Sequence, residues 1–279
     1  MSIVSDTPGD TGGNGADEED IDEEDVDEED VDEENVDEEN VDSAEDDRRG
    51  AFEDRRLGPI RRTIARRLEE SYREAVHVTV GREMDVEALV EATRRADSNA
   101  EIDVSIVDVL LAALSETLSV HTEFNATFED GVHRRYDSHH VAIAVDADSG
   151  LVTPVIENVD DRSIEEIAAE RRRLTDLVLA GDHSMSDLQG STLTVTNLGV
   201  LGVDSFTPII NPPEVAIVGL NRIRKRPIEA ESGVEFRRFM NVELTFDHRP
   251  IDGADAARFL DTLDTQLSEA DALIGRQGD

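Results

Sequence analysis

Cysteine is absent from this sequence of 279 residues. The absence excludes disulfide bonds, thiolate metal sites and a thiol nucleophile supplied by the protein. The segment G-x-S-x-G, which places a serine nucleophile on a sharp turn, is also missing. No G-x-G-x-x-G occurs either, so the chain lacks the dinucleotide-binding fingerprint. A covalent intermediate on a cysteine or on such a serine is therefore not expected.

Lysine is almost absent as well, because Lys225 is the only lysine among 27 basic residues. Aspartate and glutamate number 67, which gives a net charge of −40. Residues 1–50 hold 24 of these acidic residues and two arginines, so the rest of the chain is also acidic. At roughly 1 M salt the Debye length is about 3 Å and this repulsion is screened, whereas at low ionic strength it destabilises a compact state. The composition resembles that of halophilic proteins, and we expect salt-dependent folding. An acidic mesophilic protein is the alternative.

Long apolar runs are missing too, since no stretch approaches the ~20 apolar residues that span a bilayer. The N-terminal segment MSIVSDTPGDTGG has neither the basic region nor the apolar region of a signal peptide. We therefore expect a soluble, cytoplasmic protein with no membrane partner.

A five-residue repeat fills residues 21–42, which read IDEEDVDEEDVDEENVDEENVD. A period of five matches neither the 3.6 residues of a helical turn nor the alternation of a strand. Dense like charges repel, and one Val or Ile per repeat cannot form a core. We predict a disordered acidic low-complexity tail over residues 1–50 and a folded domain over residues 51–279. The tail is expected to solubilise the protein, and docking to a basic partner is the alternative.

Helical and strand patterns alternate from Leu57 onward. Apolar residues four apart at Ile60, Ile64, Leu68 and Tyr72 predict an amphipathic helix. Further helices are expected over residues 86–97, 103–121, 163–181 and 253–267, and strands over residues 77–85, 139–156, 191–199, 214–223 and 234–246. The pattern predicts a mixed α/β domain.

The most distinctive motif lies near the C-terminus, where FDHRPIDG contains His248, Asp252 and Gly253. This His-x-x-x-Asp-Gly motif resembles the signature of the dihydrolipoamide acyltransferase (E2) components of 2-oxo acid dehydrogenase complexes. Further matches follow in family order over residues 57–275: IRRTIARRLEES, HVTVGREMDVEALVEA, FNATF, VAIAVDADSGLVTPVI and GSTLTVTNLGVLGVDSFTPIINPPEVAIVGLNRI. The resemblance implies a CoA-dependent acyltransferase fold, a two-layer mixed sheet like that of chloramphenicol acetyltransferase.

The resemblance also implies the substrates and partners of the domain. Coenzyme A is the implied acyl partner, and the family's lipoyl and subunit-binding domains are not visible in this sequence. Because Lys225 lies within the catalytic domain, we expect lipoate to be carried by a separate lipoyl protein. A homotrimer, which can assemble into a larger cage, and the E1 and E3 components of the complex are the other implied partners.

The implied reaction exchanges an acyl group between two thiols, and it needs a base. A thiol with a pKa near 8.5 is mostly protonated at neutral pH, so a histidine suits this task. The resemblance assigns His248 as the base and the Thr196 hydroxyl as the donor to the oxyanion. The alternative for Thr196 is a purely structural role, in which its hydroxyl satisfies a hydrogen bond of the strand. Asp252 matches the family's active-site aspartate, where it could hold local geometry or pair with a cation.

Coenzyme A carries several negative charges, so this acidic chain needs a locally basic surface to bind it. Family positions that contact coenzyme A correspond to Ser105, Asp146, Thr196 and Asn197, with Arg94 aligned less securely. Basic clusters that could contribute are Arg94–Arg95, Arg171–Arg173 and Arg222–Arg226. For residues 171–173 a solvated helix face is favoured over a phosphate clamp.

Two other readings of polar clusters are not favoured. The pair His139–His140 has no third histidine or carboxylate at ligand spacing, so no metal site is expected. The basic segment RIRKRP is too isolated in an acidic chain to favour nucleic-acid binding.

The leading prediction is thus an acyltransferase core that serves a 2-oxo acid dehydrogenase complex, with an active site between neighbouring subunits of a trimer. A small-molecule acetyltransferase and a non-catalytic assembly scaffold with the same fold are the alternatives. The sequence does not distinguish acetyl, succinyl and branched-chain acyl groups.

Overall fold

The computed structural model describes residues 56–274, apart from residues 148–149 and 231–232. The predicted acidic tail over residues 1–50 lies outside the described residues. No helix in the described part of the chain is long and apolar enough to cross a membrane.

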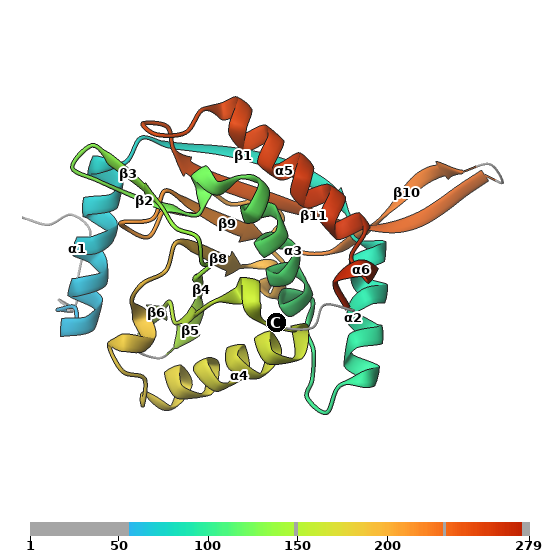
Figure 1. The fold of residues 1–279 in the computed structure, drawn as a ribbon, viewed down its shortest axis with the longest axis horizontal. Coiled ribbons are helices and arrows are strands. Elements are labelled where there is room, and N and C mark those ends of the chain that lie inside the picture. Colours follow the sequence, from blue (N-terminus) through green and yellow to red (C-terminus); the bar gives the residue numbers. More distant parts are fainter. Residues whose placement is uncertain (1–55, 148–149, 231–232, 275–279) are drawn as a thin grey trace, which may run out of the picture. The chain divides into compact units, whose positions relative to one another are not determined.

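A seven-stranded sheet forms the centre of the domain (Figure 1). Its strands lie in the order β1, β11, β9, β8, β4 and β7, and β10 pairs with the far end of β11. The bounds are β1 (His77–Asp85), β4 (Val141–Ile143), β7 (Val155–Ile156), β8 (Leu193–Asn197), β9 (Ala216–Leu220), β10 (Arg224–Ala230) and β11 (Gly233–Asp247). The β4–β8 and β8–β9 pairs are parallel, and the other pairs are antiparallel. The prediction of a mixed sheet is therefore confirmed.

Within the described residues, six α-helices accompany the sheet: α1 (Pro59–Glu74), α2 (Glu87–Asn99), α3 (Ile106–Val120), α4 (Ile164–Ala180), α5 (Gly253–Ser268) and α6 (Asp271–Ile274). Every predicted helix is present. Helix α4 begins with a capping box between Ser163 and Glu166 and ends at Gly181, whose φ of 76° is left-handed. Glycine adopts this conformation without a steric penalty, which is why the sequence marked the end of this helix correctly.

The two faces of the sheet differ in polarity because side chains alternate along each strand. Val195, Val218 and Leu244 lie on one cross-strand row and pack into the main core with the apolar sides of α2, α3 and α5. The next row, on the opposite face, consists of Thr196, Gly219, Glu243 and Gly81. Helices thus cover one face, and the other face carries polar side chains.

The segment of residues 203–214 lies against this polar face. The Phe206 ring sits 2.9 Å from the position that a Cβ atom on Gly219 would occupy, so only glycine fits there. The Ser205 hydroxyl donates to Glu243 at 2.8 Å. Helix α1 is tied to the same segment, because the Ser71 hydroxyl donates to the carbonyl of Ile210 at 2.6 Å.

Two short hairpins lie beside the main sheet: β2 (Ala126–Glu129) with β3 (Val132–Arg135), and β5 (Val145–Ala147) with β6 (Gly150–Val152). The turn of the first hairpin is Asp130–Gly131, and both residues have positive φ angles. This dipeptide is a strong hairpin signal, yet β2 and β3 were not predicted from the sequence. Single turns of 3-10 helix occupy η1 (Thr122–Phe124), η2 (Val159–Asp161), η3 (Ser186–Leu188) and η4 (Gly199–Leu201).

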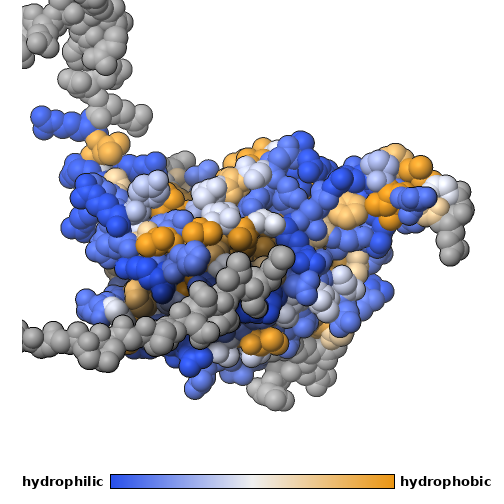
Figure 2. Space-filling model, turned by 90° about the horizontal axis from the view of Figure 1, so that it is seen from above, coloured by the Kyte–Doolittle hydropathy of each residue, from blue (hydrophilic) through white to orange (hydrophobic). Residues whose placement is uncertain are grey.

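Strands β10 and β11 continue beyond the sheet as an antiparallel hairpin that projects from the domain (Figure 1). The long strand over residues 234–246 was predicted correctly, whereas β10 was not predicted. Figure 2 shows apolar side chains on the outer part of this hairpin, where Val234 and Phe236 are exposed.

Candidate active site

His248 directly follows the last residue of β11. Its backbone N–H donates to the carbonyl of Val76 at 2.8 Å, which ties it to the start of β1. The imidazole ring lies 5.6 Å from the ring of Phe246, and 41% of the side chain is exposed. His248 is therefore anchored through its backbone while the ring remains accessible to a reactant.

Asp252 occupies the N-cap position of α5, one turn beyond His248. Its carboxylate lies 4.0 Å from Nδ1 of His248, and 83% of its side chain is exposed. This separation is too long for a hydrogen bond. Within the single chain, Asp252 therefore makes no hydrogen bond to His248.

The residues on either side of His248 form an ion pair that the sequence analysis did not single out. The buried carboxylate of Asp247 accepts three side-chain hydrogen bonds from Arg249. Nε donates to Oδ1 at 3.1 Å and to Oδ2 at 2.9 Å, and Nη2 donates to Oδ2 at 2.6 Å. Burial opposes ionisation of Asp247, but bonds from Arg249 and from the amides of Arg249 and Val76 hold its pKa below the ordinary value. The signal available in the sequence was the opposite charges in Asp-His-Arg.

Thr196 and Asn197 lie at the carboxyl end of β8. Within the described residues the Thr196 hydroxyl has no hydrogen-bond partner, and Asn197 accepts a bond from the N–H of Gly199 at 2.9 Å. Asp146, in β5, follows directly on the parallel neighbour β4 and is exposed. Because the carboxyl ends of parallel strands meet at one edge, Asp146 lies toward the edge of the sheet at which Thr196 and Asn197 end β8.

Thr196 and His248 lie at opposite ends of the sheet. Thr196 pairs with Gly219, which pairs with Glu243, so His248 lies five residues further along β11. A rise of about 3.4 Å per residue and a strand spacing of about 4.8 Å then separate the two residues by roughly 20 Å. The hydroxyl and the imidazole of one chain cannot act on the same atom.

Ser105 and Arg94 lie on helices apart from the strand ends. Ser105 caps α3, and its hydroxyl donates to the buried Asp108 at 2.7 Å. Arg94 lies on the exposed side of α2 and pairs with Glu91 at 2.7 Å. Within the described part of the chain, no hydrogen bond or ion pair connects either residue with Thr196.

The family of the chain follows from a comparison of its sequence with protein-family models. The model described as "2-oxoacid dehydrogenases acyltransferase (catalytic domain)" matches residues 49–274. The chain belongs to this family.

Similar proteins include curated relatives and solved structures. The chain is 36% identical over 221 residues to the lipoamide acyltransferase component of the branched-chain alpha-keto acid dehydrogenase complex of Pseudomonas putida, covering 77% of this chain and 52% of the relative. It is 32% identical over 226 residues to the dihydrolipoyllysine-residue acetyltransferase component of the pyruvate dehydrogenase complex of Staphylococcus aureus, covering 78% and 52%. The chain thus spans about half the length of the curated relatives it matches.

The fold prediction for this acyltransferase domain is confirmed by solved structures. Dihydrolipoamide acetyltransferase of Azotobacter vinelandii has a TM-score of 0.78 at 29% identity, covering 82% of this chain and 97% of that one. The truncated catalytic core of the 2-oxoacid dehydrogenase multienzyme complex of Thermoplasma acidophilum has a TM-score of 0.72 at 32% identity, covering 78% and 99%.

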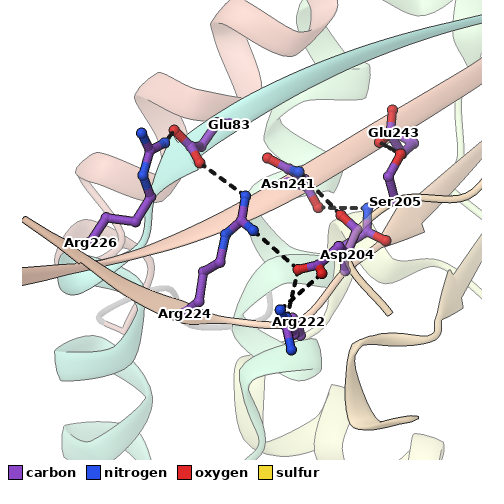
Figure 3. Close-up of polar contacts among 9 residues, drawn as sticks. Glu83, Asp204, Ser205, Arg222, Arg224, Arg226, Asn241 and Glu243 are labelled. Carbon is purple, nitrogen blue, oxygen red and sulfur yellow. Dashed lines mark hydrogen bonds and ion pairs between the residues drawn. The ribbon is translucent and has the colours of Figure 1, made fainter. Parts of the chain in front are cut away.

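The basic clusters of this acyltransferase domain are largely neutralised by acidic neighbours. Figure 3 shows Arg222 and Arg224 on Asp204, and Arg224 and Arg226 on Glu83. On α4, Arg171 binds the buried Asp108, while Arg172 and Arg173 pair with Asp103 and Glu170. Arg224 and Arg226 thus join β10 to β1, and Arg171 joins α4 to α3.

Glu214 is a buried carboxyl group that the sequence analysis missed. It accepts hydrogen bonds from Ser191 at 2.5 Å, from Thr194 at 2.7 and 2.9 Å, and from Asn211 at 3.0 Å. Burial raises its pKa to about 7, against the lowering effect of these bonds. Thr194 lies two residues before Thr196 on the same face of β8, so Glu214 supports the strand that carries Thr196.

A polar pocket of about 750 Å³ lies at the C-terminal end of α3, lined by Ser119, Thr122, His133, Arg135, Tyr136, Asp137 and His139. It contains one histidine of the His139–His140 pair. Among the described residues no group of three histidine or carboxylate side chains is placed to hold a metal ion.

Proposed function

We propose that this domain transfers an acyl group between dihydrolipoamide and coenzyme A within a 2-oxo acid dehydrogenase complex. The observation that carries the proposal is a shared spacing. In the Azotobacter vinelandii enzyme, the roles of a serine, a histidine and an asparagine in the catalytic mechanism were investigated. Their separations along that chain equal those of Thr196, His248 and Asp252 here. Threonine keeps the hydroxyl of serine, whereas Asp252 replaces a carboxamide by a carboxylate.

The proposed chemistry needs only a base and a hydroxyl donor from the protein. The His248 ring nitrogen takes the proton of the attacking thiol while the sulfur bonds to the thioester carbonyl carbon. The Thr196 hydroxyl donates to the oxyanion of the tetrahedral intermediate, a contribution of about 3–4 kcal/mol in comparable sites. When the intermediate collapses, the leaving sulfur departs and the imidazolium returns the proton to it.

This chemistry requires two copies of the chain, because Thr196 and His248 of one copy are too far apart. Exposed apolar side chains lie beside each half of the site. Val200 and Leu201, just after Thr196, are 79% and 73% exposed, and Tyr72 and Val76, beside His248, are 70% and 53% exposed. We infer that the Thr196 end of one copy docks on the His248 end of the next. A similar solved structure is the cubic core of the pyruvate dehydrogenase multienzyme complex, which supports a trimer within a cage.

Substrate delivery is part of the same proposal. Lys225, the only lysine of this sequence, lies in β10 within the catalytic domain, so we propose that the dihydrolipoyl group is carried by a lipoyl domain outside these residues. Thr196, Asn197 and Asp146 form a candidate coenzyme A surface at one strand edge. Ser105 and Arg94 remain candidates whose present partners, Asp108 and Glu91, would have to be shared with or exchanged for the ligand. The scarcity of lysine also supports operation at high salt.

The deciding experiment is an assay of acyl transfer from acetyl-CoA to free dihydrolipoamide in multimolar KCl. We expect turnover by the wild type and a loss of about 10²–10⁴-fold in His248→Ala. A panel of acyl-CoA substrates then identifies the acyl group. No turnover by either protein would support a scaffold, and transfer only to a hydroxyl acceptor would support a small-molecule acetyltransferase.

A further inference from the structure

The backbone at His248 is held by hydrogen bonds to main-chain carbonyls and to the Asp247 carboxylate. The N–H of Asp247 donates to the carbonyl of Val215 at 2.8 Å, and that of His248 donates to the carbonyl of Val76 at the same distance. The N–H of Arg249 donates to Oδ1 of Asp247 at 3.0 Å. The amide of Val76 also donates to this oxygen, at 3.1 Å. Three consecutive amides are thus held, two of them by main-chain carbonyls and one by the Asp247 side chain.

Arg249 completes the arrangement with its side chain. Its guanidinium forms a two-point contact with the Asp247 carboxylate, from Nε to Oδ1 at 3.1 Å and from Nη2 to Oδ2 at 2.6 Å. It also lies over the ring of Phe128, 4.7 Å from the centroid. A planar guanidinium matches a carboxylate in this way, whereas a lysine ammonium does not. Phe128 belongs to β2, so Arg249 connects the turn after β11 with a separate hairpin.

The two side chains of this pair differ in exposure, since Asp247 is buried and Arg249 is partly exposed. Asp247 is buried, and Arg249 holds it with charge-assisted bonds that compensate for the lost hydration. The imidazole between them stays accessible, with 41% of its side chain exposed, and no hydrogen bond joins it to either neighbour within the described residues. An accessible ring on a rigid backbone is what a general base requires.

We propose that Asp247 and Arg249 are positioning residues that hold the main chain at His248. The inference rests on the proposed function, in which His248 is the base. Other ionisable groups near this turn are Asp252, 4.0 Å from the ring, and His77 and Glu74 near Val76 and Arg249.

Kinetics of two single variants test the positioning role. In Asp247→Asn the bonds to the amides can persist, but the charge that holds Arg249 is lost. In Arg249→Gln the carboxylate remains while the guanidinium is lost. We expect kcat to fall by about 10–100-fold in each, with KM for acetyl-CoA unchanged, because coenzyme A binds at the other half of the site. Arg249→Lys should recover only part of the loss.

The matched control is Glu170→Gln, which breaks a similar two-point pair with Arg173 on α4. It should keep wild-type kcat. Thermal unfolding of every variant checks that the fold is retained, and the half-exposed Arg249 offers a milder change if Asp247→Asn fails to fold. A folded variant of either residue with wild-type kcat would overturn the proposal.

A second measurement does not depend on enzymatic activity. Diethyl pyrocarbonate modifies accessible imidazole, so the rate of His248 modification at one pH, followed by mass spectrometry, reports how the ring is presented. We expect this rate to change in Asp247→Asn and in Arg249→Gln and to stay at the wild-type value in Glu170→Gln. An unchanged rate in a folded variant of either residue would refute the positioning role even if the wild type shows no acyl transfer. Changed rates with an inactive wild type would instead reject the proposed function alone.

Discussion

Glu214 offers the sharpest test of the energetics of this domain. Its carboxyl group is 4% exposed and accepts bonds from Ser191, Thr194 and Asn211. Replacement by glutamine keeps the shape and removes the charge. The hydroxyls of Ser191 and Thr194 can rotate to accept as well as donate, so the amide can be accommodated.

The expected change in folding stability with pH follows from the pKa of Glu214. Burial raises the pKa of Glu214 from 4.5 to about 7. Because the folded pKa is above the unfolded pKa, the folded state is favoured when Glu214 is protonated. This stability is fully present below pH 4.5 and is lost as the pH rises through 7. A shift of this size corresponds to about 3 kcal/mol at 1.36 kcal/mol per pH unit.

The assay is urea unfolding of wild type and Glu214→Gln between pH 4.5 and 8.5, at one protein concentration and one KCl concentration. Other ionisable groups contribute equally to both proteins and cancel in the difference. We expect the unfolding free energy of the wild type to fall relative to the variant by about 3 kcal/mol over this range. A difference that stays constant with pH would refute the claim that burial raises the pKa of Glu214.

Three further predictions concern assembly, packing and salt. Mixing unfolded His248→Ala and Thr196→Ala chains and refolding them together should restore about a quarter of wild-type activity, since one interface in four then combines an intact His248 with an intact Thr196; no recovery would contradict a shared site. Gly199→Ala places a Cβ atom 2.5 Å from the carbonyl oxygen of Asn221 and should cost about 1–3 kcal/mol of stability, whereas Gly253→Ala, with nothing within 4 Å, should not reduce it, as thermal unfolding can show. The thermal midpoint should rise between low and multimolar KCl, and an unchanged midpoint would argue against salt adaptation.

Local features of the sequence predicted much of the fold. Helical periodicity, the glycine at the end of α4 and the alternating strand residues depend on near neighbours along the chain, so they can be read without coordinates. The Asp130–Gly131 hairpin was equally local and could have been found. The motif around His248 also identified one half of the candidate site, together with Asp252.

Helix α1 shows where local pattern stops being sufficient. Its apolar spacing predicted an amphipathic helix, and the helix is present, but Leu68 and Tyr72 remain exposed in the single chain. Periodicity reports that a face is apolar and does not report what covers it. The arginines after β9 show the same limit, since their pairing with Asp204 and Glu83 depends on where β1 and residues 203–205 lie.

The sequence alone thus determined the helices, the longer strands, the acidity and the residue types at the candidate site. Only the tertiary structure decided that Thr196 and His248 lie at opposite ends of one sheet, that Asp247 is buried in an ion pair with Arg249, and that Glu214 is buried. Strand order and register join residues far apart in the sequence, and burial depends on those distant contacts. The raised pKa of Glu214 and the separation of Thr196 from His248 therefore come from contacts that no local pattern contains.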